Sequence, residues 1–96
     1  MQNVDDEFYE RADEFINLAN EKINPAIGRG KVSASFMYGM ARFCSYVSAT
    51  NCDSKEEFIS EKNGAIEYFQ DQFRKVLEEN YDDYIEHYEK YMGDSK

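Results

Sequence analysis

Residues 31–52 read KVSASFMYGMARFCSYVSATNC, a segment that has no acidic residue and holds Arg42 as its one internal base. Acidic segments flank it on both sides. Residues 1–24 hold seven acids and two bases, and residues 53–96 hold thirteen acids and six bases. An uncharged segment at helical spacing between two charged amphipathic ones predicts a central helix that its neighbours bury.

This central helix is predicted over about 32–49 and has two faces that can pack. One face carries large side chains three or four positions apart: Val32, Phe36, Met37, Met40, Phe43, Cys44 and Val47. The other face carries small residues, which let a second backbone come close: Ser35, Gly39, Ala41, Ser45 and Ala49. Two packable faces favour a position between the two acidic helices.

The first acidic helix is predicted over about 5–24. Its apolar stripe consists of Phe8, Ala12, Phe15, Ile16, Ala19 and Ile23. Asn3 or Asp5 can cap its start, and Pro25 ends it because proline disfavours helical backbone in the residue before it. The link 25–30 contains two glycines that are free to take a positive φ.

The second acidic helix is predicted over about 54–92. Ser54 and Glu57 form a capping box at its start, and no proline follows. Apolar residues between Phe69 and Tyr81 are spaced by four, four and four, which predicts a stutter or bend near Asn80. Asn80 is also able to cap a new helix there.

The predicted architecture is therefore a single all-α domain, a three-helix bundle-like fold with a long, bent or split C-terminal helix. An unbroken helix over 54–92 would measure about 57 Å, whereas a compact domain of this size has a radius of gyration of about 13 Å. The helix must break near residue 80 or contact another chain. The aromatic row suited to such a contact is Tyr81, Tyr84, Tyr88 and Tyr91.

A second candidate site lies on the central helix. Arg42 with Tyr38 and Tyr46 has the chemistry to hold a carboxylate or a phosphate. The structural alternative for Arg42 is an ion pair with a carboxylate of a flanking helix. The loop 28–31, Gly-Arg-Gly-Lys, has the composition of a weak anion site but lacks the spacing of a phosphate-binding loop.

Catalytic and metal motifs are not recognisable in the sequence. Asp83 and His87 are four residues apart, but no second histidine accompanies them, so a solvated helix face is favoured over a metal site. Cys44 and Cys52 would lie about 12 Å apart along a helix, too far for a disulfide. We expect no catalytic residue, no metal and no cofactor.

The formal net charge of −9 and the pI of about 4.5 argue against nucleic acid and anionic membranes as partners. The same charge leaves open an acidic decoy for a basic protein. The N-terminal residues are acidic and show no signal peptide, and residues 32–52 are too polar to insert into a membrane. We therefore expect a soluble, cytoplasmic protein.

Three stretches together resemble a known bacterial family. They are residues 8–20, residues 30–43 from Gly30 to Phe43, and residues 77–91 with their tyrosines. They are similar to short helical proteins of the domain-of-unknown-function family number 3144, over about 8–92. The resemblance implies a small cytosolic proteobacterial protein and brings no activity, cofactor or site residue.

These observations favour a non-enzymatic, homo-oligomeric interaction module that works through the aromatic and acidic surface at 81–92. A protein partner other than a second copy is also compatible with that surface. The alternative functions are a small anionic-ligand binder or weak enzyme that uses Arg42 with Tyr38 and Tyr46, and an acidic decoy.

Overall fold

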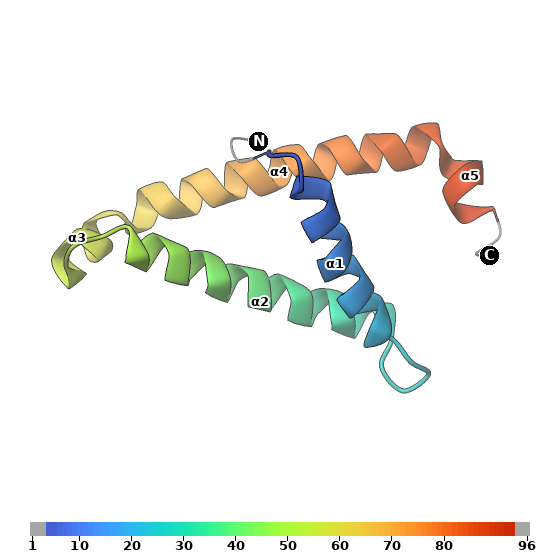
Figure 1. The fold of residues 1–96 in the computed structure, drawn as a ribbon, viewed down its shortest axis with the longest axis horizontal. Helices are drawn as coiled ribbons and strands as arrows, with labels where there is room; N and C mark the ends of the chain where they lie inside the picture. Colours follow the sequence, from blue (N-terminus) through green and yellow to red (C-terminus); the bar gives the residue numbers. More distant parts are fainter. Residues whose placement is uncertain (1–3, 94–96) are drawn as a thin grey trace. The chain divides into compact units, whose positions relative to one another are not determined.

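The computed structural model of the protein describes residues 4–93, and in that range its regular structure is entirely α-helical. The helices are α1 (Phe8–Glu21), α2 (Arg29–Thr50), α3 (Lys55–Ser60), α4 (Lys62–Glu86) and α5 (Tyr88–Met92) (Figure 1). Three of them have seven residues or more, which confirms the all-α class. The chain divides into two compact units, residues 2–58 and 59–96, whose boundary falls inside α3.

Helix α1 begins three residues later than predicted, and a carboxylate cap is not what starts it. Asp5 instead forms a two-point ion pair with Arg11, with Nη2 2.5 Å from Oδ1 and Nη1 3.2 Å from Oδ2. Its backbone carbonyl accepts a hydrogen bond from the amide of Phe8 at 3.1 Å. The residue at the N-cap position, Glu7, makes no capping hydrogen bond with its side chain. The other predicted cap, Asn3, lies outside the described residues.

The link between α1 and α2 is organised by an asparagine rather than by glycine. The Oδ1 atom of Asn24 accepts hydrogen bonds from the amides of Ala26 and Ile27, both at 2.9 Å, which closes the chain around Pro25. No described residue has a positive φ, and Gly28 is extended at φ −78° and ψ 171°. The predicted use of glycine at this turn is therefore wrong, because the asparagine side chain supplies the turn.

Helix α2 is much less buried than the sequence predicts. Val32, at 8% exposure, is the one buried residue within 4–93, whereas Phe36 is 43% and Phe43 65% exposed. Helix α1 contacts α2 but has 14 residues against its 22, so about 21 Å of helix faces about 33 Å. Burial of α2 by its neighbours is wrong for these side chains, because α1 is too short to cover them.

The start of the second acidic segment agrees with the predicted cap. Ser54 Oγ accepts the amide hydrogen of Glu57 at 3.1 Å, just before α3 begins at Lys55. The carboxylate of Glu57 in turn accepts the amide hydrogen of Asp53 at 3.0 Å. The pair thus works as a capping box whose return bond reaches one residue further back than usual.

The breaks in this segment are at Glu61 and His87, not near Asn80. Glu61 has φ −85° and ψ −7°, a tight turn that separates α3 from α4. Asn80 lies inside α4, where its Nδ2 donates to the carbonyl of Val76 at 2.8 Å. Its amide therefore supports the helix from within, and both the predicted bend and the predicted cap at Asn80 are wrong.

Helix α4 ends at Glu86, and α5 follows after the single residue His87, at φ −113° and ψ 31°. The backbone changes direction there without a proline or glycine, and α5 contacts α4. In the described part of the chain, no helix is long and apolar enough to cross a membrane.

Candidate functional site

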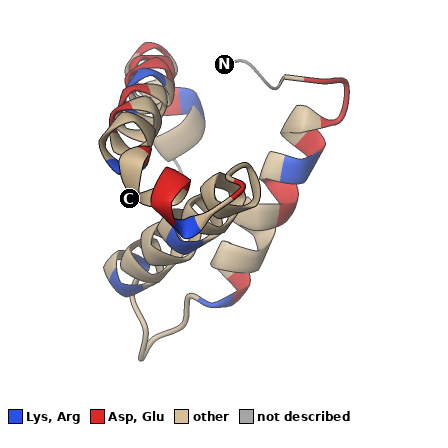
Figure 2. Cartoon of the chain, turned by 90° about the vertical axis from the view of Figure 1, so that its left-hand side faces the viewer, with Lys and Arg blue, Asp and Glu red and all other residues tan. Residues whose placement is uncertain are grey.

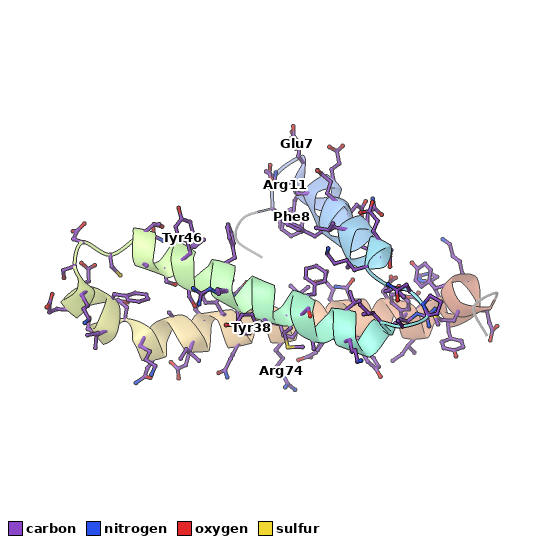
Figure 3. All side chains as sticks on the ribbon, turned by 90° about the horizontal axis from the view of Figure 1, so that it is seen from below. Glu7, Phe8, Arg11, Tyr38, Tyr46 and Arg74 are labelled. Atoms are coloured by element: carbon purple, nitrogen blue, oxygen red, sulfur yellow. The ribbon has the colours of Figure 1, made fainter. Side chains whose placement is uncertain are left out.

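The predicted binding residues share one face of α2. Tyr38, Arg42 and Tyr46 follow at intervals of four, so they form a row along the helix. They line a shallow, open depression together with Ala41 and Ser45. Both tyrosines project from α2 in Figure 3 and are 69% and 63% exposed. A guanidinium between two phenol rings can bind an anionic group, but full access of water weakens each contact.

Arg42 lacks the carboxylate partner that the structural alternative predicts. No ion pair joins Arg42 to any carboxylate of the described chain; the pairs present involve Arg11, Arg74, Lys75 and His87. The reason lies in the sequence around it, since α2 carries no acid of its own within reach along the helix. Figure 2 shows the charged positions along the chain.

Next to this row runs an exposed apolar stripe, which we call the α2 stripe. Its members and their exposures are Phe36 (43%), Met40 (41%), Phe43 (65%) and Val47 (37%). The spacing of four, three and four residues keeps them on one side of the helix. Sequence analysis predicted these residues as core, so it identified the stripe but not its exposure.

The four tyrosines predicted as an interface are not equivalent in the structure. Tyr84 and Tyr91 are in contact, with ring centroids 4.8 Å apart and planes at 49°. Seven residues of straight helix would separate them by about 10 Å along the axis, so the turn at His87 brings them together. Tyr81 is 67% exposed and Tyr88 42%. The continuous tyrosine row is therefore broken at residue 87.

Asp83 is the centre of this corner between α4 and α5. Its Oδ1 lies 3.1 Å from Nδ1 of His87, and it accepts a hydrogen bond from the hydroxyl of Tyr91. That bond, with smaller contributions from burial and neighbouring acids, raises the pKa of Tyr91 above its usual value. Lys90 Nζ lies 5.8 Å from the centre of the Tyr91 ring.

The pair Asp83 and His87 therefore serves the corner, and sequence analysis found this pair but missed the participation of Tyr91. Only the spacing of four residues was visible in advance. Tyr91 reaches Asp83 across the turn, which no periodic pattern marks. Residues 4–93 contain no group of three or more His, Cys, Asp or Glu side chains arranged for a metal.

Cys44 and Cys52 are not joined by a disulfide. Cys44 is half-buried beside the α2 stripe, and burial raises the pKa of its thiol, so its reactive thiolate is scarce at neutral pH.

The comparisons with known proteins concern most of this chain. The family model described as "Protein of unknown function (DUF3144)" matches residues 8–85. The chain belongs to the DUF3144 family. The matched region of this DUF3144 protein includes all of α2, whereas α5 and Tyr88 and Tyr91 lie beyond it.

A solved structure also resembles this DUF3144 protein over nearly its full length. It is the NMR structure of the protein NB7890A from Shewanella sp., which is 36% identical. The match covers 99% of this chain and 100% of the other, with a TM-score of 0.77. No curated protein matches this chain. The DUF3144 assignment thus confirms a small helical protein of a family with no assigned role.

Proposed function

We propose that the protein is a non-enzymatic interaction module that works as a homo-oligomer. The observation that carries the proposal is the α2 stripe, in which four large apolar side chains stand 37–65% exposed on one helix face. Exposed apolar surface of this extent on one element is typical of a contact with another chain. Burial of such side chains is the main favourable term in association.

The charge distribution supports a second copy as the partner. Two copies with a net charge of −9 each repel one another wherever their acidic helices meet. Residues 31–52 carry no acid, so this is where two chains approach at the lowest electrostatic cost. The tyrosine row predicted from sequence lies among four acids, Asp82, Asp83, Glu86 and Glu89, and is the less favourable surface for self-association.

The test is the absolute mass in solution, measured by light scattering behind a sizing column over a hundredfold range of concentration. The native protein should change from monomer to dimer or higher within this range. Phe43→Asp, which places a charge in the α2 stripe, should remain a monomer throughout. The control Ile59→Asp adds the same charge at a 62% exposed side chain on α3 and should behave like the native protein.

A monomer at every concentration would overturn the proposal. In that case the chain would have to cover its own stripe, and the role of α2 would be internal packing.

An anionic-ligand role is supported by a separate observation, the depression between Tyr38, Arg42 and Tyr46. A thermal-shift series with inorganic phosphate and with acetate tests it, because a ligand that binds the folded state raises the melting temperature with its concentration. The shift should disappear in Arg42→Gln. A flat series for the native protein would count against this role.

A further inference from the structure

The charges at the ends of α2 are the reverse of what an isolated helix favours. Arg29 and Lys31 occupy its first turn, where the helix dipole is positive, and that turn has no acid. Neither side chain forms an ion pair with a carboxylate in the part of the chain that the structure describes. At the other end, Asp53 follows the negative end of the dipole. Each end of α2 therefore has the charge that the other end would stabilise.

The middle of α2 contains a glycine that its own chain does not explain. Gly39 borders the α2 stripe, and a methyl group added there would meet no described atom within 4 Å. Glycine inside a helix is destabilising relative to alanine unless something needs the space. A second backbone approaching the stripe would need it.

The α2 stripe is also self-complementary when its direction is reversed. The intervals from Phe36 to Val47 are four, three and four residues, so they are the same when read from either end. In an antiparallel pair, Phe36 lies opposite Val47 of the second copy, and Met40 lies opposite Phe43. Reciprocal contacts of this kind define a two-fold interface.

On this basis, and resting on the proposed function, we propose that α2 pairs antiparallel with α2 of a second copy about a two-fold axis between Ala41 and Arg42. This pairing places Lys31 opposite residues 52 and 53, so that each positive end meets the negative end and the Asp53 carboxylate of the other copy. A parallel pair would instead place Lys31 beside Lys31.

The size of the contact sets its strength. Two helices of 22 residues meet along about 33 Å and over a width of about 10 Å, well under the roughly 800 Å² per partner of a standard interface. The association is therefore weak and depends on concentration, as the mass measurement is designed to detect.

Spin-label distances test the direction of the pair. Cys44→Ser and Cys52→Ser remove the native thiols, and a label is then attached at Ala34→Cys or at Ser45→Cys, both on the side of α2 away from the stripe. About a two-fold axis between residues 41 and 42, the two copies of position 34 are about 23 Å apart along the helix axis, and those of position 45 about 11 Å. The distance at 34 should therefore be distinctly longer than the distance at 45.

Equal distances would indicate a parallel pair and overturn the inference. A dimer by mass without coupling between labels on α2 would place the interface elsewhere, which refutes this pairing but leaves the proposed function standing. A monomer by mass refutes both.

A charge exchange tests the contact between the helix ends. Lys31→Glu alone and Asp53→Lys alone should each weaken dimerisation several-fold, and the double variant should restore it. The control Lys62→Glu makes the same change in net charge at the start of α4 and should leave dimerisation close to native. If the double variant is no stronger than the weaker single variant, Lys31 and Asp53 do not meet.

Discussion

Helix α2 and the corner between α4 and α5 both concentrate aromatic side chains, but they place them in opposite ways. In the corner, Tyr91 meets Tyr84 at 4.8 Å and bonds to Asp83, all within nine residues of chain. In α2, the aromatic contact is between Phe43 and Tyr46, 6.0 Å apart on the same helix, and the stripe remains exposed. A short turn can satisfy a few aromatic rings locally, whereas a long uncharged helix needs a partner of comparable length.

Truncating each surface by two side chains should produce the largest difference between these regions. Met40→Ala with Phe43→Ala should weaken dimerisation on the order of a hundredfold, because buried apolar anchors carry most of an interface's energy. Tyr84→Ala with Tyr88→Ala should leave the dissociation constant within a few-fold of native. Sedimentation equilibrium measures both. The reverse ranking would restore the tyrosine row as the interface and remove α2 from that role.

Gly39→Ala should separate folding from association. Alanine favours the helix by about 0.5–1 kcal/mol, so the melting temperature of the dilute, monomeric protein should rise. The added methyl group should at the same time weaken dimerisation. Gly64→Ala, in α4 and also with open space around it, should raise stability without changing dimerisation. If both variants dimerise like the native protein, no backbone approaches Gly39.

Tyr91→Phe should loosen the corner and leave the mass in solution unchanged. The pKa of Tyr91 is raised above 10.0 in the folded chain, so its hydroxyl contributes stability below pH 10 that is lost as the pH rises through the raised pKa. Ultraviolet titration should show one tyrosine ionising later in the native protein than in the variant. Hydrogen exchange of α5 should be faster in the variant at neutral pH. Identical exchange would mean that the bond to Asp83 does not hold α5.

The smallest effect is expected at the start of α1. The hydrogen bond with Arg11 lowers the pKa of Asp5 below 3.8, so the contribution of this pair is present above that pH and is lost as the pH falls through the lowered pKa. Arg11→Gln should return the Asp5 pKa towards 3.8 in an NMR titration. Arg74→Gln, which removes the pair with Glu78 on α4, should leave it unchanged.

The sequence predicts those parts of the fold that local chemistry controls. The helical class, the three long amphipathic segments and the cap at Ser54 follow from periodicity and from one hydroxyl. The turn at His87 does not, because residues 84 and 91 are two helical turns apart and fit an unbroken stripe equally well. Asn80 misleads for a related reason, since its amide can bond to its own helix as readily as it can cap another.

For the candidate site, residue identity was predictable but exposure was not. The row of Tyr38, Arg42 and Tyr46 follows from spacing alone, and the structure places all three around one depression. The α2 stripe has the pattern of a core helix, and no periodic signal distinguishes a stripe covered by its own chain from one that a second chain covers.

One residue beside the stripe gives the protein an internal chemical reporter. Cys44 adjoins Phe43 on α2, whereas Cys52 follows the helix and lies outside the stripe. The rate at which an alkylating reagent modifies Cys44, divided by the rate at Cys52 in the same sample, therefore measures how much of the time α2 is covered. Because both thiols are native, that ratio can be followed by mass spectrometry in unmodified protein, including protein inside living cells.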